Sequence, residues 1–173
     1  QDAGIKVPVS GKTKTWHFEA PNVHDFTWAA DKDYLHDVIK GPNNVELHFL
    51  YKNNPKIIEN WKSLQPLMIN VMAFFNKTVG DYPYKQYSFI QGGDGGMEYP
   101  MCTMMLGGGD DFEGFTGLFV HEGTHNWYYG VIGTNEAAYP WMDEGFTSYA
   151  EEECMNVLFS RGESNPHLGA YRA

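Results

Sequence analysis

The chain is poor in basic residues, in cysteine and in long apolar runs. It has 12 Lys and Arg residues against 22 Asp and Glu residues, which gives a formal net charge of −10. A nucleic-acid-binding protein needs basic patches that neutralise phosphates, so we expect no nucleic-acid partner. No apolar run has the length of a transmembrane helix, so we also expect no membrane span. The acidic excess instead favours cationic ligands, such as a free peptide amino group.

The two cysteines, Cys102 and Cys154, lie far apart in the chain and form no CxxC pair. This spacing excludes a zinc knuckle. We expect two free thiols rather than a disulfide, because a free cysteine is often a buried core residue. The first residues have neither an initiating Met nor the pattern of a signal peptide. We therefore expect a mature or excised piece without its targeting segment, which leaves the compartment open and a secreted or periplasmic location compatible.

Apolar residues make up 42% of the 173 residues, and this composition is typical of one folded domain. The period of these residues predicts strands at residues 13–19, 22–30, 45–51, 86–91 and 97–106. It predicts helices at residues 55–78, 112–129 and 143–159, and we expect Pro66 to bend or split the first. We therefore predict an α+β fold. Residues 1–110 would form a β-sheet-rich lobe with one long helix, residues 111–160 a helix pair and residues 161–173 an irregular tail.

The strongest motif is the pentapeptide His121-Glu122-Gly123-Thr124-His125, inside the helix predicted at residues 112–129. Residues i and i+4 lie on one face of a helix about one turn apart, so both imidazoles can reach one metal ion. The carboxylate of Glu122 would lie beside the metal without being a ligand and could take a proton from an attacking water. The pattern predicts one zinc ion with His121 and His125 as ligands and Glu122 as the catalytic base.

A catalytic zinc ion has three protein ligands and one open position, so a third ligand is expected. Glu144 lies nineteen positions after His125, at the start of the helix predicted at residues 143–159. An antiparallel return helix would bring its carboxylate to the metal, which makes residues 111–160 a zinc-binding helix pair. The pentapeptide with Glu at one fixed later position would arise by chance in roughly one in a thousand such sequences. This frequency favours a zinc site over a solvated helix face that is rich in His and Glu.

Two further segments complete a recognisable pattern. Downstream the chain has Trp141-Met142-Asp143-Glu144-Gly145-Phe146, in which eighteen residues separate Glu144 from His125, and upstream it has Gly95-Gly96-Met97-Glu98-Tyr99-Pro100. The first segment resembles the Trp-Leu-Asn-Glu-Gly-Phe type segment around the third zinc ligand in the M1 family of zinc aminopeptidases. The second is similar to the Gly-x-Met-Glu-Asn motif of that family. The resemblance is confined to motifs within residues 86–153, with a weaker match in element order before them.

The resemblance implies an incomplete thermolysin-like metallopeptidase domain, in which a β-rich N-terminal lobe is followed by the zinc-binding helices. It implies removal of N-terminal residues from peptides, with Glu98 binding the free α-amino group. Gly95, Gly96 and Met97 would then lie along the peptide as an edge strand. It also implies that Glu151, seven positions after Glu144, orients a zinc-bound imidazole through a hydrogen bond.

Two departures from the family pattern bear on activity. Tyr99 stands where the family motif has Asn, which alters the environment of the first substrate side chain. The oxyanion-stabilising Tyr of the family lies several tens of residues past the third ligand, whereas this chain has 29 residues after Glu144. We therefore expect residues 1–173 to be a single truncated catalytic domain that works with the remaining domains of a parent enzyme. Loss of one oxyanion donor costs about 10²–10³ in rate, so we expect weak or no activity from this chain alone.

Three other functions are compatible with the same residues. A thermolysin-like endopeptidase would share the zinc site but would leave Glu98 without an amino group to bind. A related branch of the same family opens epoxides. A non-catalytic, zinc-stabilised module that binds peptides is favoured by the expected absence of the Tyr and by Tyr99.

Overall fold

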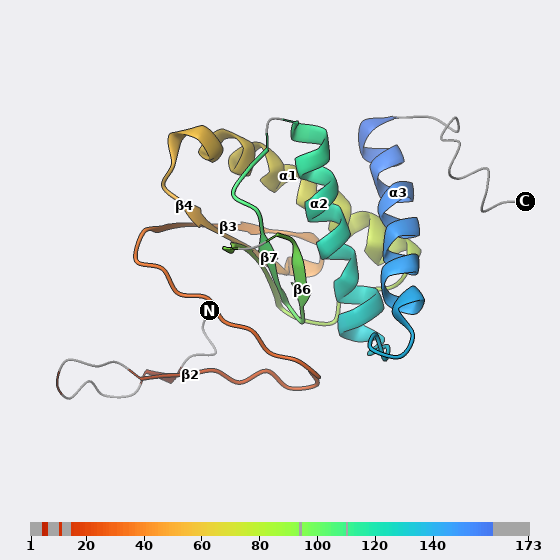
Figure 1. Cartoon of the computed structure of the whole chain (residues 1–173), viewed down its shortest axis with the longest axis horizontal. Helices are drawn as coiled ribbons and strands as arrows, with labels where there is room; N and C mark the ends of the chain where they lie inside the picture. The colour runs from red at the N-terminus through yellow and green to blue at the C-terminus, as the bar shows by residue number, and fades with distance from the viewer. Residues whose placement is uncertain (1–4, 7–10, 12–14, 94, 110, 161–173) are drawn as a thin grey trace, which may run out of the picture.

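A computed structural model describes residues 5–6, 11, 15–93, 95–109 and 111–160, which form an α+β fold (Figure 1). Its strands are β1 (Ile5–Lys6), β2 (Trp16–His17), β3 (Tyr34–Lys40), β4 (Glu46–Lys52), β5 (Gln86–Gln91), β6 (Met97–Tyr99) and β7 (Cys102–Met105). Its helices are α1 (Pro55–Thr78), α2 (Phe112–His125) and α3 (Phe146–Phe159), with a 3₁₀ turn η1 (Pro42–Asn44) and two π-helical turns, η2 (Asn126–Val131) and η3 (Trp141–Gly145). The predicted irregular tail at residues 161–173 lies outside the described residues.

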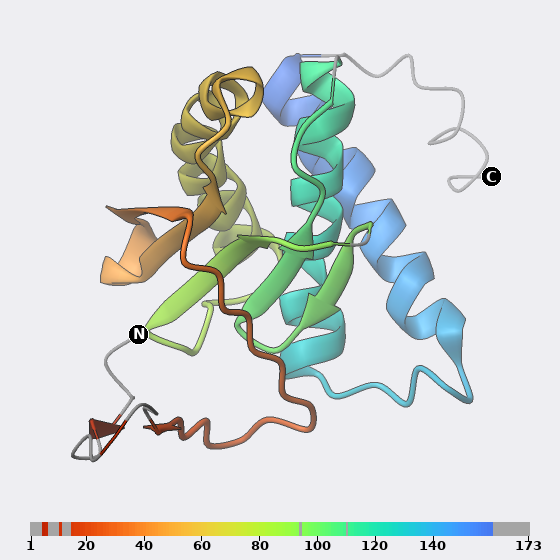
Figure 2. The same cartoon turned by 60° about the vertical axis from the view of Figure 1, so that its left-hand side comes forward.

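Strands β3 to β7 form one mixed sheet in the order β3-β4-β5-β7-β6, and β1 pairs separately with β2. β3 is antiparallel to β4, and β4, β5 and β7 are parallel to one another. β6 pairs antiparallel with β7. The parallel step from β4 to β5 passes through α1, because parallel neighbours need a long crossover connection. β6 is therefore an edge strand, and it contacts α2 (Figure 2).

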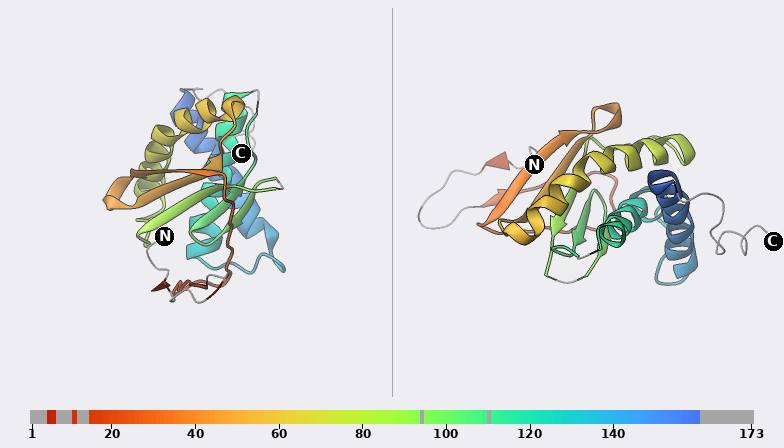
Figure 3. Two further views of the ribbon diagram at one scale, coloured as in Figure 1. Left: turned by 90° about the vertical axis from the view of Figure 1, so that its left-hand side faces the viewer. Right: turned by 90° about the horizontal axis from the view of Figure 1, so that it is seen from above.

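The helices lie on one side of this sheet, where α1 and α2 pack on its strands and α3 packs on α2 (Figure 3). The side chains of Leu47, Phe49 and Tyr51, at alternating positions of β4, are fully buried in this layer. Tyr51 stacks on Trp61 of α1 with 4.9 Å between ring centroids, and Trp61 meets Phe119 of α2 edge-on at 5.0 Å. These aromatic contacts fix α2, and with it the His-Glu pentapeptide, against the sheet.

The strand predicted at residues 22–30 is wrong, because this segment is irregular in the structure. Its alternating residues Phe26 and Trp28 face no core, and Trp28 is 73% exposed. The segment is held by single hydrogen bonds, among them one from His24 Nε2 to the Tyr129 carbonyl at 2.9 Å. The prediction failed because a strand needs a neighbour for its backbone N–H and C=O groups, which alternation alone does not supply. The strand that pairs with β4 is β3, which the sequence analysis missed.

The single strand predicted at residues 97–106 is also wrong, because β6 and β7 form a hairpin there. The chain turns at Pro100 and Met101, where Met101 has φ = 60°. Proline cannot donate to a sheet ladder, and a left-handed residue reverses the chain, so these two positions end β6. The hairpin places Glu98 on the edge strand, opposite Thr103 of β7.

The other predicted elements agree with the structure apart from their ends. The helix at residues 55–78 and the strand at residues 86–91 are confirmed, and Pro66 does not split the helix. The strand at residues 45–51 is shifted by one residue. Of the strand predicted at residues 13–19, residues 13 and 14 lie outside the described residues, and among residues 15–19 only 16–17 are a strand, β2. The helix expected to end at residue 129 continues after His125 as the π-helical turn η2, and the last helix begins with η3.

The described residues include both cysteines and all three long helices. Cys102 and Cys154 are free thiols, and Cys154 is buried, as expected for a core residue. No helix in the described part of the chain is both long and apolar enough to cross a lipid bilayer.

Candidate metal centre

Helix α2 carries the first two candidate ligands one turn apart. Its first turn is capped by Asp111, whose carboxylate accepts hydrogen bonds from the backbone N–H groups of Glu113 and Gly114, both at 3.1 Å. Such a cap satisfies orphan N–H groups and fixes the start of the helix. The rings of His121 and His125 then lie on one face, edge to face, with 4.9 Å between their centroids.

The structure brings His121, His125 and Glu144 together. The Nε2 atoms of the two imidazoles are 3.2 Å apart, and Glu144 Oε2 lies 3.3 Å from His121 Nε2 and 3.7 Å from His125 Nε2. Tetrahedral ligands bound to zinc at 2.0–2.1 Å would be about 3.3–3.4 Å from one another. Two imidazole nitrogens and one carboxylate oxygen also match the donor set of a catalytic zinc ion. The three residues therefore fit one zinc ion with a fourth position open.

Glu144 reaches this position because the chain returns along α2. After η2 and a loop, the π-helical turn η3 leads directly into α3, and both α2 and η2 contact this returning segment. The side chain of Glu144 is 55% exposed, so the centre is open to solvent on this side. An open side is what a catalytic rather than a structural metal site needs.

The segment that returns along α2 also contacts the Nδ1 atoms of the two imidazoles, on the side of each ring away from the metal position. Asp143 Oδ1 lies 2.6 Å from His125 Nδ1, Glu151 Oε2 lies 2.9 Å from His121 Nδ1, and Thr147 Oγ1 lies 3.3 Å from His125 Nδ1. A carboxylate only accepts hydrogen bonds, so each Nδ1 carries a proton, and in the neutral form of each ring the lone pair of Nε2 is directed toward the metal position. The contact predicted for Glu151 is present in the structure.

Asp143 was missed by the sequence analysis. Its signal was nonetheless present, because positions 143, 147 and 151 are spaced by four and fall on one helical face. Asp143 and Thr147 are both buried at the α2–α3 contact, where an aspartate is stable only when it is hydrogen-bonded. One face of the returning helix thus supplies a row of hydrogen-bond acceptors to the zinc motif.

The two imidazoles have pKa values that are shifted in opposite directions. Burial alone would lower the pKa of His121, but the hydrogen bond from its ring to Glu151 and the nearby carboxylates raise it to about 8. Burial, together with the charge of His121, lowers the pKa of His125. In the metal-free protein one imidazole of the pair is therefore protonated near neutral pH, and a metal ion must displace this proton.

Glu122, the predicted base, lies beside the ligands without joining them. Its side chain is 6% exposed, and its Oε2 has no hydrogen-bond partner among the described residues. A methyl group built on Gly96 would lie 2.1 Å from Glu122 Oε1, so the chain entering β6 runs directly over this carboxylate. Burial, more than the neighbouring charges, raises the pKa of Glu122 to about 7.

Glu98 of β6 lies in the same cluster, with 7% of its surface exposed. Ligand atoms of Glu98, Glu122 and His125 all lie within 4.8 Å of one another. Burial and the charges of Asp143, Glu144 and Glu136 raise the pKa of Glu98 to about 7. The neighbouring motif residues are more open: Met97 is exposed, and nothing lies within 4 Å of a methyl group built on Gly95.

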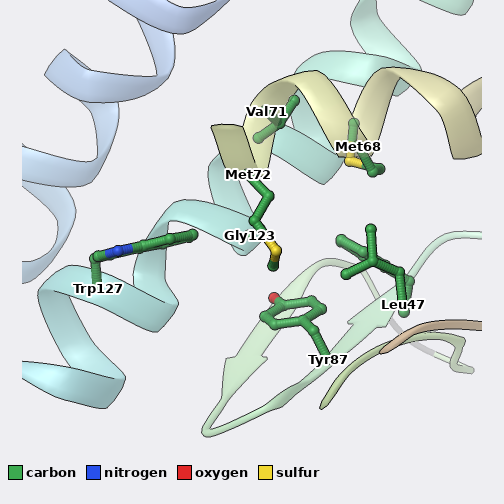
Figure 4. A pocket seen from close by; sticks show the side chains of 8 residues that line it. Leu47, Met68, Val71, Met72, Tyr87, Gly123 and Trp127 are labelled. Atoms are coloured by element: carbon green, nitrogen blue, oxygen red, sulfur yellow. The ribbon is translucent and has the colours of Figure 1, made fainter. Parts of the chain in front are cut away.

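A small apolar pocket reaches α2 at Gly123 (Figure 4). Gly123 lies two positions from both His121 and His125, and therefore on the opposite face of the helix. Gly123 lines it from α2, and the hydroxyl of Tyr87 accepts a hydrogen bond from Asn126 Nδ2 at 2.9 Å. The remaining lining residues are apolar: Leu47, Met68, Val71, Met72, Phe89 and Trp127. Tyr87 is the one titratable group in this lining, and burial raises its pKa well above the usual value, so the pocket belongs to the core.

Comparison with known proteins gives no identification. No protein family matches this chain, and no curated protein sequence matches it either.

Proposed function

We propose that this chain is the zinc-binding part of an aminopeptidase of the M1 family, with a thermolysin-like catalytic domain. The observation that carries the proposal is the spacing of 3.2, 3.3 and 3.7 Å among the Nε2 atoms of His121 and His125 and Oε2 of Glu144. The hydrogen bonds that Asp143 and Glu151 accept from the two imidazoles support it, because metal-binding histidines almost always donate their second ring N–H to such a group. The motif resemblance adds the family.

A zinc ion held by these ligands would polarise a carbonyl and lower the pKa of a water molecule to about 7. Glu122 then acts as the general base that removes the proton from the attacking water. Its raised pKa of about 7 suits this role, because the best general base has a pKa near the working pH. The same carboxyl group, once protonated, can donate to the leaving amine.

Glu98 supports an aminopeptidase rather than an endopeptidase. A carboxylate buried to this degree is costly unless a cation or a hydrogen-bond donor neutralises it. A peptide with a free α-ammonium group supplies that cation, whereas an internal peptide bond does not. β6 is an edge strand, so an extended peptide can pair with it and bring its first residue beside Glu98.

The proposal is tested with purified chain that has been loaded with zinc. We expect one zinc ion per chain by elemental analysis, and release of alanine from Ala-Ala-amide, followed by mass spectrometry over hours so that slow turnover is detected. The N-acetylated peptide should remain intact, and Glu122→Gln should abolish release while zinc is retained.

Each contrary outcome points to a different function. Equal cleavage of free and acetylated peptides would support an endopeptidase. Zinc and peptide binding with no turnover that depends on Glu122, even after the remaining domains of the parent enzyme are restored, would support a non-catalytic module. Absence of zinc, or zinc that survives the loss of His125, would overturn the metal site itself.

A further inference from the structure

Three carboxylates gather beside the candidate zinc ligands, on the side of the centre that faces β6. Oxygen atoms of Glu98, Asp143 and Glu144 all lie within 4.8 Å of one another. Glu98 comes from the edge strand, and the other two come from η3. Glu98 and Asp143 are buried, whereas Glu144 opens to solvent, so water molecules can complete the ligand shell of an ion held there.

A separate observation points to a cation at this place. The Oε2 atom of Glu122 is buried without a hydrogen-bond partner among the described residues, and Glu122 belongs to the same cluster through Glu98. A buried carboxylate oxygen without a partner costs free energy that a nearby positive charge removes. Such an orphaned group therefore indicates a ligand that binds from solution.

In the metal-free chain the charge of protonated His121 acts on Glu122 and Asp143, but zinc binding displaces this proton. Among the described residues the ion pairs of lysine side chains are those between Lys40 and Glu46 and between Lys52 and Asp31, which do not involve the cluster. A zinc ion at His121, His125 and Glu144 carries two positive charges, of which Glu144 balances one, whereas Glu98, Glu122 and Asp143 together carry up to three further negative charges. The cluster therefore has capacity for a second cation.

We propose that Glu98, Asp143 and Glu144 form a second, weaker site for a hard divalent cation such as Mn²⁺, adjacent to the zinc ion. This inference rests on the proposed function, because the same position would receive the α-ammonium group of a peptide. The donors are all carboxylate oxygens, which suit Mn²⁺, whereas the imidazole-containing triad suits zinc. Asp143 Oδ1 accepts the hydrogen bond from His125 Nδ1, so its other oxygen is the one left for the second ion, and Glu144 would be shared between the two sites. An ion held there inhibits peptide cleavage by competing with the substrate.

The test is a titration of the zinc-loaded chain with Mn²⁺, in which electron paramagnetic resonance measures free Mn²⁺. We expect one bound Mn²⁺ per chain and at least a tenfold weaker affinity in Glu98→Gln. The matched control is Glu136→Gln, because Glu136 is an exposed acidic residue whose charge acts on Glu98 but which is not part of the triad. This control should bind Mn²⁺ like the wild-type chain.

A second measurement uses displacement. Ala-Ala-amide should release the bound Mn²⁺, and its N-acetylated form should not. Absence of Mn²⁺ binding, or equal binding by Glu98→Gln and the wild-type chain, would overturn the second site. Elemental analysis of zinc tests the proposed function separately. The comparison of Mn²⁺ binding by Glu98→Gln and Glu136→Gln is valid with or without peptide turnover. Failure of the second site is therefore distinguishable from failure of the proposed function.

Discussion

The Nδ1 atom of His125 lies 2.6 Å from Oδ1 of Asp143, and both side chains are buried. The residue after Asp143 is the candidate third ligand, Glu144. One short backbone segment therefore supplies a metal ligand and also fixes the tautomer of another ligand. The position of η3 against α2 thus decides two properties of the centre at once.

Substitution of Asp143 should weaken zinc binding. We expect Asp143→Ala to lower zinc affinity about 10–100-fold, because the His125 ring loses its orienting acceptor. Asp143→Asn should lower zinc affinity less, since the amide oxygen can still accept a hydrogen bond from Nδ1–H of His125. Competition with a chromogenic chelator measures both, with Glu136→Gln as the control for a nearby lost charge. Equal affinity in the alanine variant and the wild-type chain would show that the contact does not orient the ligand.

Zinc affinity should depend on pH through His121. The pKa of this imidazole is raised to about 8 in the metal-free protein, and zinc binds only the unprotonated ring. Affinity should therefore rise with pH up to about 8 and level off above it. Glu151→Gln removes the hydrogen-bonding carboxylate and should move this midpoint to lower pH. Isothermal titration calorimetry with zinc across pH 5.5–9 measures the midpoint, and an unchanged midpoint in the variant would contradict the assignment.

The stability of the metal-free chain should fall as pH rises through the range in which Glu98 ionises. The pKa of Glu98 is raised from 4.5 to about 7, so between these values the folded state binds more protons than the unfolded state. Stability then decreases with rising pH across this window. Glu98→Gln removes the effect, so its Tm should exceed that of the wild-type chain at pH 8 and match it at pH 4. Differential scanning calorimetry with chelator present tests this, with the exposed Glu59→Gln of α1 as the control.

Phe119 should be a principal stabilising residue of the layer that holds α2. It is fully buried and lies against Trp61, Phe89 and Phe115, with ring centroids 5.0, 5.4 and 4.9 Å away. We expect Phe119→Ala to lower the free energy of unfolding by about 3–5 kcal/mol. Val157 of α3 is 65% exposed, so Val157→Ala should change it by less than about 0.5 kcal/mol. Urea denaturation measures both, and comparable values for the two variants would contradict the packing described here.

The parts of the fold that the sequence predicted well are those with a local cause. The helix at Pro55–Thr78 follows from apolar residues at helical spacing, and its Asn54 cap accepts from the Lys56 N–H. The buried strand β5 follows from a short apolar run between turns. By contrast, residues 22–30 have Phe26 and Trp28 at alternating positions but pair with no strand, whereas β3 has its apolar residues in adjacent pairs, at 34–35 and 38–39, and pairs with β4. Pairing between distant segments decided that outcome, and no local pattern records it.

The sequence by itself determined the candidate zinc motif, because helical geometry places residues four apart on one face. It indicated Glu144 by its place at the start of the next helix, and the family resemblance implied Glu151. Only the tertiary structure decided that Asp143 holds His125 and that Glu98 lies among the carboxylates of the centre. These contacts join a sheet edge, a helix and a returning helix, and they depend on how α2 packs on the sheet. Packing of this kind arises from the whole set of buried side chains, so it has no signature within a single segment.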